Sequence, residues 1–377
     1  MSDPAQPKRG VRLSREQRLA WLRLIRSENV GPATFRNLIN RFGGAEAALD
    51  AIPDLARRGG GRPIRITSID AAEAELATAE RLGAQFICRG EPDYPAIMRG
   101  VDQAPPVLAV MGDVAQLNRP AVAIVGARNA SLAGIKLTHR IADELGAAGY
   151  VIVSGLARGI DAAAHEAALP HGTVGVFAGG LDRPYPKENR PLMRRMVDGR
   201  GCVISEMPFG WEPRAIDFPR RNRVVAALSL GLLVVEAASR SGSLISARLA
   251  AELGRLVFAV PGSPLDPRAA GTNQLLKTGS LLVTEAADII IALRPLDDRI
   301  GRSGDDMDEP EAIMPAEEPA EGERERIVEA LGTTPVSIDD LLAHTSASVG
   351  ALQLVLLELD LAGRLERHSD GRVSIVL

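Results

Sequence analysis

Six short apolar segments, each running directly into a loop rich in glycine, serine or proline, constrain the fold of this chain more than any other feature. They are AVAIVGARNAS, YVIVSGLARGID, TVGVFAGGLDRPYP, CVISEMPFG, LGLLVVEAASRSGS and LVFAVPGSP. Strands that are apolar on both faces are typical of a parallel sheet covered by helices on both sides. The sequence between them predicts such helices at 132–148, 160–169, 188–197 and 243–253. We therefore expect an α/β fold with a doubly wound, Rossmann-like parallel sheet over residues 84–296.

The segment before this sheet predicts helices. Ser14 and Gln17 have the spacing of a capping box, and Val30-Gly31-Pro32 predicts a turn into a second helix that ends at Gly43. Residues 1–83 are thus expected to form a helical domain similar to a SAM or helix-hairpin-helix unit, whose turn can present backbone N–H groups to a phosphate. The alternative is an accessory helical domain with a basic, solvated face.

An acidic stretch separates the sheet from the tail of the chain. From Asp297 to Glu323, eleven acidic residues stand against two arginines, and no residue is aromatic. This composition cannot bury enough apolar surface to offset its ordering entropy, so we predict a linker over residues 297–321. Residues 322–377 predict a winged-helix domain, with helices over 323–331, 338–342 and 349–361 and a hairpin formed by 365–367 and 372–376.

The charges of this tail argue against DNA binding by its third helix. Between Ile327 and Gly363 the chain has no lysine or arginine, whereas it has Asp339, Asp340, Glu358 and Asp360. Phosphate contacts dominate DNA affinity and require cations, so a helix with the sequence VGALQLVLLELDL cannot attract a duplex. We therefore predict that the winged helix contacts protein, either the N-terminal part of this chain or a separate partner.

Charge and cysteine content narrow the classes of protein further. The net charge is −4, and the acidic stretch contributes −9 (eleven acidic residues less two arginines), so the remainder carries +5 and is compatible with a polyanionic partner. Cys88 and Cys202 lie far apart without a C-x-x-C motif, which excludes a disulfide framework and a thiolate zinc site. The start of the chain lacks a signal-peptide core, and the longest apolar stretch, residues 224–235, is too short to span a membrane. We expect a cytoplasmic protein with no metal site and no membrane contact.

The predicted site lies in the loops after the strands, because ligands of a doubly wound sheet bind beyond the carboxyl ends of its strands. These loops offer backbone amides next to glycine, hydroxyl groups, helix N-termini and arginines, all of which favour an anion. The candidate residues are Arg128, Asn129, Gly155, Arg158, Ser241, Gly242 and Ser243. No P-loop motif occurs, and VGARNASLAG lacks the second glycine of a dinucleotide fingerprint, so neither ATP nor NAD nor any other cofactor is expected.

A second group of candidates lies in AIDFPRRNRVVAALS. Phe218 is one of only twelve aromatic residues in the chain, and it is followed closely by Arg220, Arg221, Asn222 and Arg223. A ring for base stacking beside cations for phosphates is the arrangement used for single-stranded nucleic acid. The alternative is that Phe218 packs in the core and that the arginines pair with acidic residues.

Together these motifs resemble the DNA processing protein A family (DprA, also called Smf). The resemblance rests on Asp93-Tyr94-Pro95, Val125 to Arg128, Ser154 to Asp161, Gly180 to Asp182 with Tyr185-Pro186 and Asn189, Ser205-Glu206, Phe218 to Arg223, Ser241 to Ser243 and Gly271 to Asn273. It implies an ATP-independent protein, not an enzyme, that binds single-stranded DNA, protects incoming DNA and loads the RecA recombinase in natural transformation. It also implies a homodimer formed through the Rossmann-like domain. The DNA pocket that it implies falls on Arg128, Phe218, Arg220 to Arg223, Ser241 to Ser243 and Asn273.

One function of a different class stays open. Glu236 ends an apolar segment near Ser241 to Ser243, an arrangement that faintly resembles Rossmann-like enzymes that hydrolyse the N-glycosidic bond of nucleotides. In such an enzyme Glu236 would be the acid or base, whereas its structural alternative is to cap a helix or hold an arginine. Release of free base from a nucleotide, and the dependence of affinity on oligonucleotide length, distinguish the two functions.

Overall fold

The computed structural model describes residues 10–303, 318–320, 322–368 and 371–376. These residues form two compact units. The first contains residues 10–12 and 75–303, and the second combines residues 13–74 with the described residues from 318 onward. The helical and winged-helix segments, which the sequence predicted as separate domains, are therefore parts of one unit.

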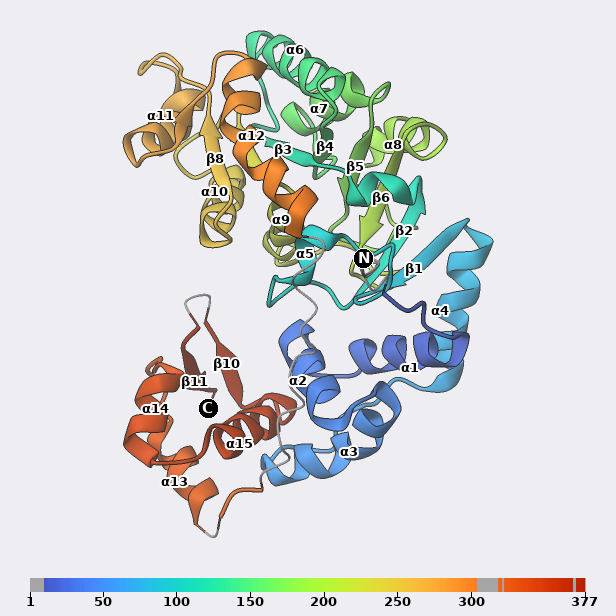
Figure 1. Cartoon of the computed structure of the whole chain (residues 1–377), viewed down its shortest axis with the longest axis vertical. Helices are drawn as coiled ribbons and strands as arrows, with labels where there is room; N and C mark the ends of the chain where they lie inside the picture. Colours follow the sequence, from blue (N-terminus) through green and yellow to red (C-terminus); the bar gives the residue numbers. More distant parts are fainter. Residues whose placement is uncertain (1–9, 304–317, 321, 369–370, 377) are drawn as a thin grey trace, which may run out of the picture. The chain divides into compact units, whose positions relative to one another are not determined.

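A nine-stranded sheet forms the centre of the first unit, in the order β1-β2-β6-β5-β4-β3-β7-β8-β9 (Figure 1). The parallel part confirms the predicted doubly wound, Rossmann-like sheet and consists of β3 (Ala121–Val125), β4 (Val151–Ser154), β5 (Thr173–Val176), β6 (Gly201–Ser205), β7 (Gly231–Val234), β8 (Leu256–Ala259) and β9 (Leu281–Leu282). Two further strands, β1 (Ala84–Cys88) and β2 (Val107–Gly112), extend it at one edge in antiparallel pairing. The pattern of apolar segments followed by glycine loops did not single these two out.

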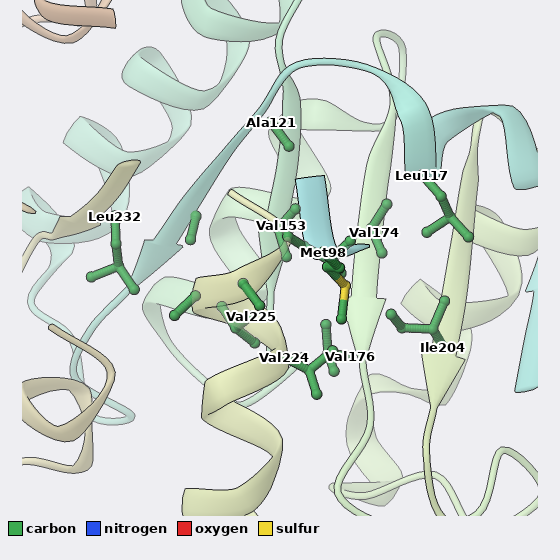
Figure 2. Close-up of a cluster of buried hydrophobic side chains, with 14 of the residues drawn as sticks. Met98, Leu117, Ala121, Val153, Val174, Val176, Ile204, Val224, Val225 and Leu232 are labelled. Carbon is green, nitrogen blue, oxygen red and sulfur yellow. The ribbon is translucent and has the colours of Figure 1, made fainter. Parts of the chain in front are cut away.

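Helices cover both faces of the sheet, because alternate side chains of a buried strand point to opposite sides. On β3, Val122 and Ile124 pack against α6 (Leu132–Ala147), α7 (Ile160–Ala168) and α12 (Ala286–Ser303). Ala121 and Val125 point to the other core, which contains side chains of α5 (Ala96–Arg99), α9 (Asp217–Ala227) and α10 (Gly242–Glu252). Figure 2 shows part of this second core, with Met98 of α5 among valine side chains of the strands and of α9.

The predicted helices of the first unit match α6, α7, α8 (Arg190–Val197) and α10 to within two residues at each end. The unit also contains α11 (Ala270–Lys277) and three short 3-10 turns, at Val114–Asn118, Lys187–Asn189 and Pro267–Ala269. Helix α12 continues to Ser303, so residues 297–303, which the sequence predicted as the start of the linker, are helical. Composition alone does not mark where a helix ends. Residues 304–317 and 321 of that linker lie outside the described residues.

The first two helices of the second unit have the boundaries that the sequence predicts. In α1 (Arg15–Arg26), the Ser14 hydroxyl accepts a hydrogen bond from the Gln17 amide at 3.1 Å, which completes the capping box. Helix α2 (Pro32–Phe42) starts with a proline and ends at Gly43, whose φ of 73° is left-handed and favours glycine. Helix α3 (Ala45–Arg58) follows, and α4 (Ile69–Arg81) leads into the first unit.

The tail has the predicted winged-helix elements. These are α13 (Glu323–Ala330), α14 (Ile338–Thr345) and α15 (Val349–Leu361), followed by the antiparallel pair β10 (Leu365–Arg367) and β11 (Val373–Ile375). Among the described residues, no single helix has the length and apolar character needed to cross a membrane; α14 and α15 meet those criteria only as a pair, bent by 118° at the break between them.

Candidate nucleic-acid interface

The direction of winding reverses at β3. From β3 the chain passes outward through β4, β5 and β6 on one side, and it returns to β7, β8 and β9 on the other. In a doubly wound sheet, the loops at such a reversal leave a crevice beyond the carboxyl ends of the strands. The loop after β3 and the N-terminus of α10, which follows β7, both line a pocket there. The structure thus has a pocket at the edge of the sheet where the sequence predicted the site.

Two adjoining pockets formed by described residues share a wall made of Arg128, Ala157, Phe218 and Arg221. The first, called the polar pocket here, has a volume of about 270 Å³ and is also lined by Gly126, Asp161, Asn222, Ser241 to Ser243 and Ser246. The second, called the aromatic pocket, has a volume of about 190 Å³ and is also lined by Asn129, Gly155, Arg158, Tyr185 and Pro186. Each is far larger than the roughly 10–15 Å³ that a single water needs, so each can admit part of a larger ligand.

Two aromatic rings and a cation meet at the shared wall, where Phe218 and Arg128 belong to the wall and Tyr185 to the aromatic pocket beside it. Arg128 Cζ lies 5.5 Å from the centroid of the Phe218 ring, which is a cation–π distance. The Tyr185 ring meets Phe218 edge to face, with centroids 5.8 Å apart. Phe218 is half-buried and Tyr185 is 51% exposed, so the pair borders the pocket rather than filling a core. This geometry contradicts the alternative in which Phe218 is an ordinary core residue.

Arg221 forms the floor beneath both pockets. Its side chain is buried, and Nη1 donates hydrogen bonds to the carbonyl oxygens of Gly155 and Val176. Burial lowers the pKa of the Arg221 guanidinium, while the nearby carboxylate of Asp161 opposes that shift. An arginine stays protonated in proteins, so Arg221 supplies a fixed positive charge below the crevice. Its backbone partners hold that charge in place.

Asp161 shapes the loop after β4 from below. Its Oδ2 atom accepts hydrogen bonds from the amides of Gly155 at 3.1 Å and Ala157 at 3.4 Å. Burial raises the pKa of the Asp161 carboxyl, and the charge of Arg221 opposes this. One helical turn later, His165 is fully buried with Nδ1 2.6 Å from the Thr173 hydroxyl. Asp161 therefore supports the loop that carries Arg158, whereas His165 joins α7 to β5.

The polar pocket contains the N-terminus of a helix. Ser241 caps α10, with its hydroxyl accepting a hydrogen bond from the Ser243 amide at 3.3 Å. The two serine hydroxyls lie 2.7 Å apart. On the opposite side, a Cβ atom at Gly126 would lie 2.6 Å from Ile160 Cγ1, so the loop after β3 can approach α7 only with glycine at this position. A helix N-terminus with hydroxyl groups and Arg128 nearby favours an anion such as a phosphate.

Three of the predicted site residues, Arg220, Arg223 and Asn273, lie outside both pockets. Residues 217–227 form helix α9, and on a helix positions three or four apart share a face. Phe218, Arg221 and Asn222 therefore lie on one face. Arg220 and Arg223 do not share it. Arg223 instead pairs with Glu206 and the Gln103 carbonyl. The Nδ2 atom of Asn273 donates a hydrogen bond to the Gly262 carbonyl at 2.9 Å, and its Oδ1 atom accepts one from the Gly262 amide at 3.2 Å. The sequence prediction treated residues 220–223 as a continuous run and did not consider the helix; DNA binding by Arg220, Arg223 and Asn273 stays a prediction.

Glu236, the candidate acid or base, is also placed away from the pockets. Its carboxylate accepts hydrogen bonds from the backbone amide of Ser131, at 2.9 Å, and from the Ser131 hydroxyl. Ser131 is the N-cap of α6, and Gly134 in the first turn leaves room for the carboxylate, which a Cβ atom there would approach to 2.7 Å. A negative charge near a helix N-terminus is stabilising, so the geometry favours the structural alternative for Glu236.

The sequence prediction missed the second ring of the site. Tyr185 belongs to the loop after β5, in a glycine-containing segment of the same kind as those that supplied Arg128 and Arg158. Aromatic residues are rare in this chain, and that rarity singled out Phe218 in the sequence analysis. The same argument would have singled out Tyr185. Among the described residues, no group of three or more His, Cys, Asp or Glu side chains is placed to hold a metal ion.

Three family models match successive parts of the chain. The family described as DNA recombination-mediator protein A matches residues 85–294, which is more than half of the chain. The chain belongs to the DprA family. Two further DprA models match the second unit: the DprA-like N-terminal HHH domain at residues 15–78 and the DprA winged helix domain at residues 309–371. The HHH match agrees with the predicted resemblance of the first helices to a helix-hairpin-helix unit.

Individual DprA relatives resemble the chain over most of its length. Protein Smf of Escherichia coli is 34% identical over 309 residues, which are 80% of each chain. Putative DNA processing protein DprA of Mycobacterium tuberculosis is 33% identical over 95% of this chain and 94% of its own. The crystal structure of DprA from Streptococcus pneumoniae matches with a TM-score of 0.60 and 31% identity, over 75% of this chain and 98% of that one. A structure of DNA processing protein A from Helicobacter pylori, described for its unique single-stranded DNA binding mode, matches with a TM-score of 0.51 and 32% identity over 57% of this chain and 96% of that one.

Proposed function

We propose that this DprA-family protein binds single-stranded DNA across the polar and aromatic pockets, and that it holds the strand without a chemical reaction. The observation that carries this proposal is the pair of pockets on either side of Arg128 and Phe218. A nucleic-acid strand alternates bases with phosphates, and the two pockets offer rings on one side and anion-binding groups on the other. The H. pylori relative, with its single-stranded DNA binding mode, supports the same ligand class.

The two rings favour a single strand over a duplex. Stacking of a base on Phe218 or Tyr185 requires a base that is not already stacked and paired in a helix. Arg128 and the N-terminus of α10 would take an adjacent phosphate, and Arg221 would add its fixed charge from below. Because neither stacking nor phosphate contacts depend strongly on base identity, we expect little sequence preference.

Affinity as a function of oligonucleotide length tests this proposal. Fluorescence anisotropy with thymidine oligomers from one to about twenty nucleotides, and with a duplex of matching sequence, should show affinity that rises over several nucleotides and a preference for the single strand. A matched control is Arg81→Ala, which removes an exposed arginine of the same unit outside both pockets and should change affinity little. Equal affinity for a mononucleotide and a long strand would contradict the proposal.

We further propose that the bound strand is incoming DNA in natural transformation, which the protein protects and on which it loads the RecA recombinase. The names of its relatives, DNA processing protein and DNA recombination-mediator protein, support this role. The homodimer through the Rossmann-like domain and the cytoplasmic location belong to the same proposal. RecA filament assembly on DNA coated with single-strand-binding protein should accelerate when the protein is added, and sedimentation should give twice the chain mass. No acceleration, or a monomer at all concentrations, would contradict the respective part.

The hydrolase alternative has its own decisive outcome. Incubation with deoxynucleoside monophosphates should release no free base, because Glu236 is bound to the start of α6 and not to either pocket. Release of base by the wild-type protein that Glu236→Gln abolishes would establish the enzyme. The same variant should lose thermal stability in the binding-protein interpretation, since the amide caps Ser131 more weakly than the carboxylate.

A further inference from the structure

Helix α15 is apolar on opposite sides and takes part in two separate cores. One side belongs to the winged helix itself, where Leu352, Val355, Leu356 and Leu359 pack with side chains of α13, α14 and the hairpin. The other side carries Leu354, Leu357 and Leu361, which pack with Phe35, Leu38 and Ile52 of the N-terminal helices. A helix that is apolar all round is buried all round. The position of α15 corresponds to the helix that enters the major groove in DNA-binding proteins of the helix-turn-helix kind.

We propose that the permanent partner of this winged helix is the N-terminal helical segment of its own chain, and that α15 does not read DNA. The two segments then form one folding unit with a continuous apolar interface. The partner of the winged helix is therefore residues 13–66 of the same chain, and neither a DNA duplex nor a second protein. This goes beyond the single-strand binding proposed above, since it concerns the other compact unit.

Hydrogen bonds at the edge of this interface fix the position of the end of α15. The Thr34 hydroxyl donates to the Asp360 carboxylate at 2.9 Å, and the Asn29 side-chain amide donates to the Leu361 carbonyl at 2.9 Å. In the opposite direction, Arg364 of the winged helix donates a hydrogen bond to the carbonyl of Gly59 at 3.0 Å. Thr34 and Asn29 flank the turn that the sequence suggested for phosphate binding, and the structure directs them to α15 instead.

Both carboxylates of α15 are paired with arginines of this unit. Glu358 is 1% exposed, and it accepts two hydrogen bonds of 3.0 Å from Arg324, with Arg58 of α3 at 3.9 Å. Asp360 accepts a further hydrogen bond, of 3.0 Å, from Arg367 of the hairpin. A buried carboxylate is costly without such partners. Arg364 and Arg367, two basic residues that a wing would offer to phosphates, therefore serve contacts within the chain.

Two glycines after α3 allow the close approach of α15. A Cβ atom at Gly59 would lie 2.6 Å from the carbonyl carbon of Glu358, and one at Gly61 would lie 2.7 Å from Ala362 Cα. The φ of Gly59 is −68°, which alanine adopts without strain. Glycine at this position is therefore required by the neighbouring helix and not by its own backbone. Gly59→Ala consequently tests the interface selectively.

Hydrogen exchange of the full chain, measured by mass spectrometry, distinguishes a shared fold from two independent ones. In Gly59→Ala we expect exchange to rise at least tenfold both in α2–α3 and in α13–α15, while the strands of the first unit keep their protection. Gly332→Ala is the matched control: it changes a glycine of the same unit whose nearest neighbour to an added Cβ is 3.9 Å away, and it should leave exchange unchanged. Thr34→Val, which removes one hydrogen bond, should give the same pattern with smaller amplitude.

Two results would overturn the proposal. If exchange rose only in the N-terminal helices while α13–α15 stayed protected, the winged helix would be an independent domain. If Gly59→Ala raised affinity for duplex DNA tenfold or more, the N-terminal helices would be masking a DNA-reading helix instead of replacing its ligand. We expect the variant and the wild type to bind a duplex equally at the same salt concentration, and single-strand affinity to change by less than about threefold.

Discussion

Arg128 lies over the ring of Phe218, with its guanidinium carbon 5.5 Å from the ring centroid. The two residues come from different parts of the first unit, Arg128 from the loop after β3 and Phe218 from the first turn of α9. Their contact closes the wall between the polar and aromatic pockets, so a base and its phosphate would meet the same pair of side chains from two sides. The predictions for these two residues are therefore linked but distinguishable.

Replacing Phe218 with alanine should weaken single-strand binding by about 1–3 kcal/mol, the usual value of one stacked base, and should leave the fold intact. Titration by anisotropy and a thermal melt measure the two effects. Phe209→Ala is the matched control, because Phe209 is also half-buried and meets Phe86 edge to face at 5.9 Å but lies outside both pockets. If Phe218→Ala lowers Tm sharply and binding falls only with it, Phe218 is a packing residue.

Replacing Arg128 with alanine should reduce the dependence of binding on salt. Each phosphate contact on a single strand contributes about 0.7 to the slope of log affinity against log salt, so the slope should fall by about that amount. Affinities at four or more salt concentrations give the slope, with Arg81→Ala as the control for a general loss of charge. An unchanged slope together with unchanged affinity would remove Arg128 from the site.

Glu188→Gln should strengthen single-strand binding. Glu188 is 2.5 Å from Arg158 at the edge of the aromatic pocket, and both side chains are more than half exposed. Removing one negative charge a few ångströms from a bound phosphate is worth about 0.5–1 kcal/mol in a high dielectric, or roughly two- to fivefold in affinity, and salt should screen the gain. Glu80→Gln, an exposed change outside the pockets, should have little effect. Weaker binding would show that Glu188 holds Arg158 in its binding orientation.

Acid should destabilise the first unit through His165. Thr173 donates its hydroxyl proton to the Ile152 carbonyl, so it accepts from Nδ1 of His165, and Nε2 is buried without a partner among the described residues. Burial, with a smaller effect of Arg221, lowers the pKa of His165 from 6.5 to about 3. The unfolded chain therefore binds this proton first, and the stability contributed by neutral His165 is lost as the pH falls from 6.5 toward 3.

The variant His165→Leu should flatten the fall of Tm with pH below 6.5, where the effect begins. Asp161, whose pKa is raised by burial, acts in the opposite direction and stays in the variant. The control is His344→Leu, since His344 is exposed and belongs to the other unit. Parallel Tm curves for His165→Leu and the wild type would contradict the prediction.

The parallel sheet could be predicted because its strands are local patterns. Each apolar run is buried on both faces and ends in a glycine loop, so Val122 and its neighbours need no distant information to be recognised as a strand. The edge strand β1 lacks that pattern, since it pairs only with β2 and shows an exposed residue at Gln85. Its antiparallel partner is set by the tertiary fold and not by the local sequence.

The site could be predicted only in part, for a related reason. The loop residues Arg128, Gly155 and Ser241 follow strands, and the rule for doubly wound sheets brings such residues together. In α9 the helix determines which residues of Arg220 to Arg223 face the crevice, and Pro219 obscured that helix in the sequence. Asn273 and Glu236 are polar groups used to hold the loops, a role that a motif does not distinguish from ligand binding.

The second unit combines residues 13–74 with the described residues from 318 onward, and the first unit lies between them in the sequence, which has a consequence for biosynthesis. Helices α1 to α3 leave the ribosome before most of the first unit, whereas the leucines of α15 that complete their core are translated after it. The Rossmann-like domain can fold between these two events, because domains generally fold as units while the chain is being synthesised. A product of interrupted translation would retain an uncovered face around Phe35, Leu38 and Ile52, which chaperones and proteases recognise. Closure of the unit therefore requires that translation has passed Leu361.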